Sequence, residues 1–223
     1  MLKEFDNIRI FFLFSLAIIL VGCTTSPTTN PQSSHSTKSD EQNVKEQATN
    51  RPFSSLLTTY FPPDGTTAYF QGEGNEFASY TLQTTYIDDM TIAQLENNGG
   101  VTLLKVYRIT KSAVELVYME AVDETPILPT IQEIATLPVI ETILHLPLEV
   151  GSRFDGWEIL STTATITTGL TTFHDVIELK KTKDNMTTFK YFAKGVGLIY
   201  TKDEMVTNNG ESFTITSTLQ KIE

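Results

Sequence analysis

Short β-rich segments alternate with polar turns along most of the chain from residue 66 onward. Successive side chains of a strand point to opposite faces, so alternating apolar and polar residues predict half-buried strands. In segment 161–168 the threonines at 163, 165 and 167 would share one face, and Ala164 and Ile166 the other. The expected strands are Ala68–Gln71, Glu76–Ile87, Thr91–Glu96, Val101–Thr110, Ala113–Ala121, Trp157–Thr168, Thr171–Lys180, Thr187–Ala193, Leu198–Lys202 and Phe213–Lys221.

Asparagine and glycine mark the turns between these segments. Residues 97–100 read Asn-Asn-Gly-Gly between two expected strands, and Asn208-Asn209-Gly210 precede the last one. Asn-Gly between two β-like runs is a strong hairpin signal. The sequence therefore predicts a single all-β domain, mainly antiparallel, built as a sandwich or as an open, curved, barrel-like sheet.

Segment 125–148 interrupts the strand pattern. Its isoleucines and leucines could lie on helical faces, but prolines at 126, 129, 138 and 147 would cut any helix short. We expect at most one short helix near 130–136, centred on Thr130–Ala135, and then a strand near Ile140–Leu146.

The N-terminus has the features of a secretory leader. Lys3 and Arg9 precede an uncharged apolar run, Ile10–Val21. That length suits the apolar core of a signal peptide and falls short of the roughly 20 residues of a spanning helix. Residues 1–22 are therefore expected to be removed from the mature protein.

The end of that run, Leu20-Val21-Gly22-Cys23, resembles the lipobox of bacterial lipoprotein precursors. The resemblance implies that the Cys23 thiol receives a diacylglyceryl group and that Cys23 becomes the new N-terminus after cleavage. The alternative is an unmodified, buried cysteine in a signal anchor. Two acyl chains give lasting membrane attachment, so the resemblance implies a lipid-anchored protein on the extracytoplasmic face of the cell membrane.

Residues 23–50 differ in composition from the rest of the chain. After Cys23, Ser, Thr, Gln and Asn dominate, and Val44 is the one large aliphatic residue. Such a segment buries too little apolar surface to fold, so it predicts a tether. The expected organisation is a signal peptide (1–22), a lipidated cysteine with its tether (23–50) and a β-rich extracellular domain (51–223).

Charge and cysteine content exclude several functions. The net charge of −11 disfavours nucleic-acid binding and adhesion to anionic lipid through a basic patch. Cys23 is the single cysteine, and once lipidated it leaves no thiol for a disulfide, a metal site or a nucleophile. The domain must therefore fold on its hydrophobic core, and its contact with the membrane is expected to be the covalent lipid.

No motif nominates a catalytic, metal or cofactor site. Gly195-Val196-Gly197 lacks the Gly-Lys-Ser/Thr of a P-loop and is better explained as a tight bend. The acidic turn at 73–76 is too short to bind calcium alone. His174 and Asp175 are adjacent on an expected strand and would point to opposite faces. His145 has no helical metal-site partner. We therefore expect no cofactor and no metal.

Aromatic residues are plentiful and could form either a core or a ligand pocket. Tyr80, Leu82 and Tyr86 share strand parity, as do Phe189 and Tyr191. Aromatic faces can stack on sugars or line an apolar pocket. A domain of this size also needs large core side chains, and the core interpretation is favoured.

Three segments resemble a group of poorly characterised secreted and lipoprotein domains of Gram-positive bacteria. The resemblance implies an all-β extracellular domain and supplies no catalytic residue. The segments are Tyr60-Phe61-Pro62-Pro63 with Tyr69–Ala78, then Phe173–Leu179, and Tyr191–Leu198.

Three functions remain open at this point. The first is a non-enzymatic binding or protein-interaction domain displayed on the membrane, with a protein, glycan or lipid as its ligand. The second is a carrier that holds a lipid or other apolar ligand in a cavity of a curved sheet. The third is a cell-envelope hydrolase, which would need Asp, Glu or His side chains converging in a cleft.

Overall fold

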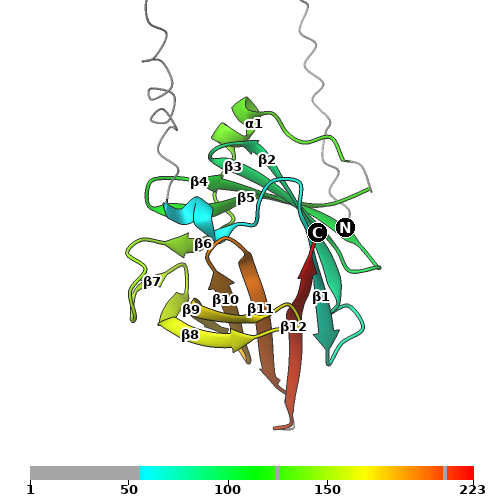
Figure 1. Cartoon of the computed structure of the whole chain (residues 1–223), viewed down its shortest axis with the longest axis vertical. Helices are drawn as coiled ribbons and strands as arrows, with labels where there is room; N and C mark the ends of the chain where they lie inside the picture. Colours follow the sequence, from blue (N-terminus) through cyan, green and yellow to red (C-terminus); the bar gives the residue numbers. More distant parts are fainter. Residues whose placement is uncertain (1–55, 124–125, 208–209) are drawn as a thin grey trace, which may run out of the picture. The chain divides into compact units, whose positions relative to one another are not determined.

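The computed structural model describes residues 56–123, 126–207 and 210–223, which all belong to one compact unit, Thr49–Glu223. These residues form one 12-stranded sheet in the order β6-β5-β4-β3-β2-β1-β12-β11-β10-β9-β8-β7. Every neighbouring pair is antiparallel, and the sheet curves until its two edge strands, β6 and β7, contact each other (Figure 1). The predicted all-β fold is confirmed, in its curved, barrel-like form.

The elements follow one another along the chain with short connections. They are η1 (Leu56–Tyr60), β1 (Thr67–Glu73), β2 (Tyr80–Asp88), β3 (Thr91–Asn97), β4 (Thr102–Ile109), β5 (Ala113–Val122), α1 (Ile131–Thr136), β6 (Glu141–His145), β7 (Arg153–Phe154), β8 (Trp157–Thr167), β9 (Thr172–Lys183), β10 (Met186–Ala193), β11 (Gly197–Val206) and β12 (Ser212–Ile222).

The predicted helix and the strand after it are both present, as α1 and β6. Two short elements were not expected, the 3₁₀ helix η1 and the two-residue strand β7. The second expected strand was placed too early, because residues 75–78 form a turn. The Asn75 side chain accepts a hydrogen bond from the Phe77 N–H at 2.7 Å, and the Ala78 N–H bonds to the Asn75 carbonyl.

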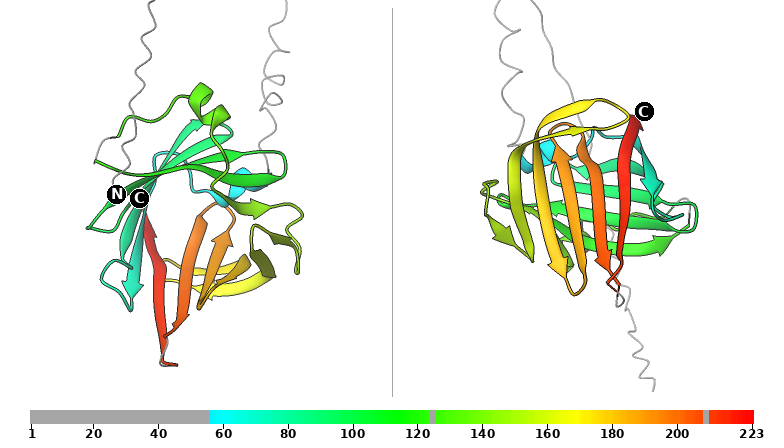
Figure 2. Two further views of the ribbon diagram at one scale, coloured as in Figure 1. Left: turned by 180° about the vertical axis from the view of Figure 1, so that it is seen from behind. Right: turned by 90° about the horizontal axis from the view of Figure 1, so that it is seen from below.

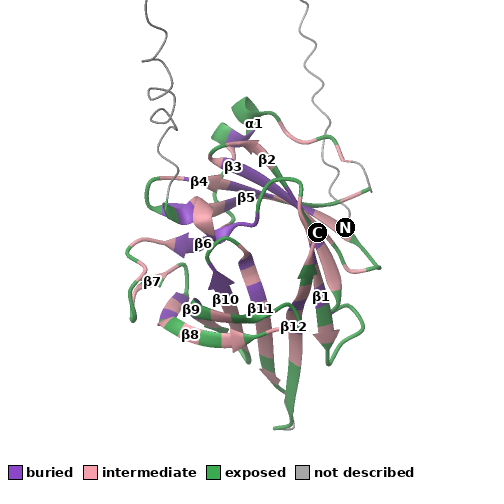
Figure 3. Ribbon diagram, viewed as in Figure 1, coloured by how far each residue is buried: buried purple, intermediate pink, exposed green. Residues whose placement is uncertain are grey.

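Three apolar clusters hold the sheet together. The first fills the barrel at the η1 end and includes Leu57, Ile92 and Leu179, all fully buried. The second covers the outer face of β9–β11 and continues to Ala68 and Leu82, which line the cavity described below. The third lies on the outer face of β3–β5. Figure 3 shows buried residues along β3–β5 and the η1 ends of β10 and β11, whereas the far end of β12 is exposed.

The β8–β9 hairpin bends back over the outer face of the barrel and covers the second cluster. Its tip reaches β12, where the Gly169 N–H bonds to the Leu219 carbonyl at 3.1 Å (Figure 2). Three register shifts along the β8–β9 pairing make this bend possible. Ala164 and Ile166 pack on the cluster beneath, which confirms the two faces predicted for this strand.

The third cluster is covered by the segment that carries α1. Thr130 and Glu133 cap the helix reciprocally, and Ile134 packs into the cluster. Arg108 joins the strands to this segment: its guanidinium binds Glu115 at 2.8 Å and donates to backbone carbonyls of α1 and Leu137 at its C-terminal end. The short helix is therefore held both by packing and by hydrogen bonds from Arg108.

The loop between β1 and β2 folds against the wall of the barrel at a glycine. A Cβ on Gly72 would lie 2.1 Å from the Ala78 carbonyl carbon, so no side chain fits. The Ser217 hydroxyl donates to the Ala78 carbonyl at 2.8 Å, and the Gly72 N–H donates to the Ser79 hydroxyl at 2.8 Å. This packing fixes the loop at the cavity described below.

We predict that Gly72→Ala destabilises the protein, because its Cβ meets rigid backbone. The expected loss in free energy of unfolding is about 1–3 kcal/mol, measured by urea denaturation. Gly100→Ala is the matched control, since the nearest atoms to its Cβ would belong to side chains, the Phe77 ring at 2.9 Å, which can rotate away, and Asn98 Oδ1 at 3.5 Å. Equal losses for the two variants would contradict this account of the loop.

Candidate ligand-binding cavity

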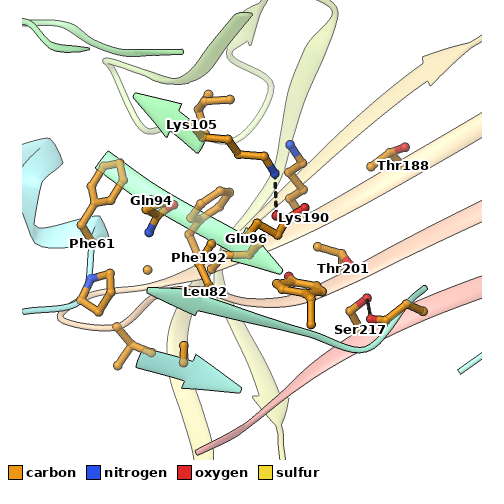
Figure 4. Close-up of a pocket in the computed structure, with 18 of the residues that line it drawn as sticks. Phe61, Leu82, Gln94, Glu96, Lys105, Thr188, Lys190, Phe192, Thr201 and Ser217 are labelled. Atoms are coloured by element: carbon orange, nitrogen blue, oxygen red, sulfur yellow. Dashed lines mark hydrogen bonds and ion pairs between the residues drawn. The ribbon is translucent and has the colours of Figure 1, made fainter. Parts of the chain in front are cut away.

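A cavity of about 330 Å³ lies inside the barrel. Its walls come from the inward positions of β2, β3, β4, β6, β10, β11 and β12, with the segment after η1 at one end (Figure 4). Alternation along β10 shows how the sheet sorts its side chains: Thr188, Lys190 and Phe192 line the cavity, whereas Tyr191 and Ala193 belong to the outer cluster. The cavity exists because the sheet curves far enough to enclose it.

The end of the cavity nearest η1 is apolar. Phe61 lies at this end with its ring centroid 5.3 Å from that of Tyr107, and Phe192, Ile143 and Leu198 complete the surface. Most of these side chains belong to the first apolar cluster. The cavity is therefore a continuation of the core rather than a surface groove.

The Gly195-Val196-Gly197 segment forms the bend that lets η1 close this end. Both glycines have positive φ, and the Gly195 N–H bonds to the Thr59 carbonyl at 2.6 Å. A Cβ on Gly197 would approach the Tyr60 carbonyl to 2.9 Å. The interpretation of this segment as a tight bend is confirmed, and close approach of η1 is the reason for glycine.

The middle of the cavity carries polar and charged side chains. Lys105 on β4 forms an ion pair with Glu96 on β3. The Thr188 hydroxyl donates to Asp203 on β11 at 2.6 Å. Polar groups inside a barrel are stable only when they are paired or hydrated, and these pairs meet that condition.

Further side-chain contacts join the two edges of the sheet along the seam where β6 meets β7. Glu141 on β6 accepts hydrogen bonds from the Trp157 Nε1–H of β8 at 3.0 Å and from Lys181 Nζ of β9 at 2.8 Å. The Thr142 N–H of β6 donates to the Asp155 carboxylate of the β7–β8 turn at 2.8 Å. Side chains thus join edge strands that share no backbone ladder.

Lys190 differs from the other lysines of this region. Its ammonium lies over the Trp157 ring, 4.9 Å from the centroid, and no acceptor of the described residues lies within hydrogen-bond distance of it. Burial lowers the pKa of Lys190, Lys105 and Lys181 lower it further, and Glu141 and Glu96 only partly compensate. A cation held in this way is available to an incoming anion.

For Glu141, the neighbouring cations and hydrogen bonds outweigh the effect of burial on the pKa, which is the reverse of the case of Lys190. Burial alone would raise its pKa, but the charge of Lys190 and the hydrogen bonds from Lys181 and Trp157 outweigh it, so the pKa lies below the usual 4.5. The carboxylate is therefore ionised at neutral pH. Its contribution to stability is complete above the usual carboxyl pKa and is lost as the pH falls through the lowered value.

The residues singled out in the sequence are not brought together in the cavity. His174 bonds to the Thr165 hydroxyl at 3.2 Å, and Asp175, with φ of +53°, forms a bulge in β9 on the exposed side. His145 is partly buried beside Phe154, with ring centroids 6.1 Å apart. Glu73 and Glu76 are exposed, and no cluster of potential metal ligands occurs within the described ranges.

The lipobox residues Leu20, Val21, Gly22 and Cys23 lie outside the described residues, so the predicted lipidation stays a prediction. No helix in the described part of the chain is long and apolar enough to cross a bilayer.

The aromatic residues divide between the two interpretations. Tyr80 and Leu82 line the cavity, whereas Phe189 and Tyr191 pack outside the barrel.

Sequence reasoning missed Lys190, Lys105 and Glu141. A signal was present in the strand pattern, since Lys190 shares parity with Phe192 and so stands on an inward position. The sequence alone does not show which face of β10 is the inner one, because both faces carry aromatic residues. The parity of Lys190 is therefore informative only once the inner face is known.

Comparison with known proteins yields only distant likenesses. No family model matches the chain, and no curated protein matches it. A candidate exported protein of Bacteroides fragilis with a YmcC-like fold is 12% identical, covering 74% of this chain and 99% of its own, with a TM-score of 0.45. A candidate lipoprotein of Parabacteroides distasonis is 15% identical, covering 74% of this chain and 98% of its own, with a TM-score of 0.44.

We predict that Glu141→Gln lowers the free energy of unfolding by about 1–3 kcal/mol at neutral pH, because Lys181 and Lys190 lose their nearby negative charge. The difference from the wild type should shrink as the pH falls from 4.5 through the lowered pKa of Glu141, because the wild-type carboxylate then becomes protonated as well. Chemical denaturation at several pH values measures both effects. Glu158→Gln is the control, since its partner Arg153 is 74% exposed. A pH-independent difference would contradict the assigned role of Glu141.

Proposed function

We propose that this protein is a lipoprotein, anchored through Cys23 to the extracytoplasmic face of the membrane, whose barrel binds a small amphipathic molecule. The lipobox supports the anchor, with diacylglyceryl and acyl chains such as palmitate as its chemistry. The resemblance to Gram-positive lipoprotein domains supports a Gram-positive source. The cavity supports the binding function.

The observation that carries the binding proposal is the cavity of about 330 Å³ on the inner side of the barrel. Ligand pockets of proteins occupy roughly 300–1,000 Å³ and combine apolar walls with a few placed polar groups. This cavity has an apolar end around Phe61 and Phe192 and polar side chains next to it. A molecule with an apolar part and a polar end matches that division.

The cavity also distinguishes between the functions left open by the sequence. Several of its polar side chains are engaged with one another, in the Lys105–Glu96 ion pair and the Thr188–Asp203 hydrogen bond, which suits holding a ligand in place. An apolar-ligand carrier is therefore better supported than a protein-interaction surface. The tether would allow the carrier to move above the membrane while its lipid stays inserted.

We predict that Thr201→Trp reduces ligand uptake at least about tenfold by filling the cavity, since Thr201 lies on its wall and the indole is much larger. The measurement is fluorescence titration with the neutral apolar probe N-phenyl-1-naphthylamine, using the mature chain with Cys23→Ser so that no acyl chain competes.

Thr216→Trp is the matched control, because Thr216 follows the lining residue Ile215 on β12 and points to the outer face. It should bind the probe as the wild type does. Circular dichroism would confirm that both variants fold. Probe binding that Thr201→Trp leaves unchanged would refute a ligand site in this cavity.

A further inference from the structure

We infer that the ligand of this cavity is a small amphipathic monocarboxylate, and that Lys190 is the residue that receives its carboxylate. This inference rests on the proposed function and adds the chemical class of the ligand. It is carried by the pairing of charges inside the barrel, by the supply of hydrogen-bond donors there and by the position of Lys190 between polar and apolar walls.

Two of the three lysines near the cavity already have an acidic partner. Lys105 binds Glu96, and Lys181 binds Glu141 at 2.8 Å. Lys190 has neither an ion pair nor a hydrogen-bond acceptor in the described part of the chain; its ammonium lies over the Trp157 ring, and the charges of Glu141 and Glu96 only partly offset its burial. A partly compensated cation in a low-dielectric interior is costly. A bound anion would supply the missing partner.

Two tyrosines offer further hydrogen-bond donors at the cavity. Tyr80 and Tyr107 line it, and no hydrogen bond joins either hydroxyl to a described residue. Burial raises the pKa of both phenols, so they stay protonated and can donate. A carboxylate only accepts hydrogen bonds, so it can accept from Lys190 and from a tyrosine hydroxyl at the same time.

The surrounding charges limit the ligand to a single negative charge. Glu96 of β3 and Glu141 of β6 are the carboxylates whose charges act on Lys190, and each already forms an ion pair with another lysine, Lys105 or Lys181. A dianion such as a phosphate monoester would add a second negative charge beside these carboxylates. A monocarboxylate brings one charge and two acceptor oxygens, which Lys190 and a tyrosine hydroxyl can share.

The position of Lys190 also sets the orientation of the ligand. Lys190 and Phe192 are inward neighbours on β10, about 7 Å apart along the strand. Beyond Phe192 lie Phe61 and Leu198 at the apolar end. The carboxylate would therefore lie at Lys190 with the apolar tail directed toward η1. A volume of 330 Å³ equals roughly eleven water molecules at liquid density, which suits a short alkyl or aryl chain.

The test compares octanoate with 1-octanol, which has the same alkyl chain and no charge. Both are used to displace N-phenyl-1-naphthylamine from the mature chain carrying Cys23→Ser. The wild type should bind octanoate at least about tenfold more tightly than 1-octanol at pH 7. Octanoate affinity should also fall as the pH rises through the pKa of Lys190, because the neutral amine no longer attracts the carboxylate.

Lys190→Met removes the charge and keeps a chain of similar length. It should abolish the preference, so that octanoate binds no more tightly than 1-octanol. Lys180→Met is the matched control, because Lys180 lies on the outer face of the neighbouring strand, opposite Phe189. It should retain the preference.

The outcomes separate the two proposals. Equal affinities for octanoate and 1-octanol, or a preference that survives in Lys190→Met, would overturn the carboxylate inference and leave the cavity as a general apolar site. Probe binding that neither compound reduces and that Thr201→Trp does not weaken would overturn the proposed function itself. If Lys190→Met does not fold, Lys190→Gln provides the same comparison with a polar, uncharged side chain.

Discussion

The closure of the barrel depends on one carboxylate at the seam between its edge strands. β6 and β7 do not share a backbone ladder, so the 12-stranded sheet could have stayed open. Glu141 joins the two edges by accepting hydrogen bonds from both Trp157 and Lys181. The Thr142–Asp155 hydrogen bond and the packing of Ile143 with Trp157 in the first cluster join the same edges.

The same closure explains why the interior carries charge at all. Inside a barrel the dielectric is low, and each ion needs a partner. Lys105 and Lys181 satisfy this within the protein, whereas Lys190 depends on the Trp157 ring and on more distant carboxylates. A side chain that lowers the stability of the free protein is typical of a binding position, because a bound ligand can supply the interaction that the side chain lacks.

The positions of most strands can be predicted from the local alternation of apolar and polar residues, whereas the cavity cannot. Alternation and Asn-Gly turns placed most of the strands, and Thr130 with Glu133 marks the start of α1. The bend of the β8–β9 hairpin was not predictable, because it arises where His174 and Asp175 bulge out of register. Phe189 and Tyr191 were grouped correctly by parity, but which side of the sheet they face depends on that bend.

The sequence by itself determined the all-β class, the strand order along the chain and the candidate lipid anchor at Cys23, since these rest on local periodicity and a contiguous motif. Tertiary structure alone decided which face of each strand became the interior. That choice depends on curvature and on contacts between residues far apart, such as Glu141 with Lys181 across the seam. The same holds for Lys190, because only the closed sheet shows that its ammonium lies over the Trp157 ring with no ion pair or hydrogen bond to a described residue.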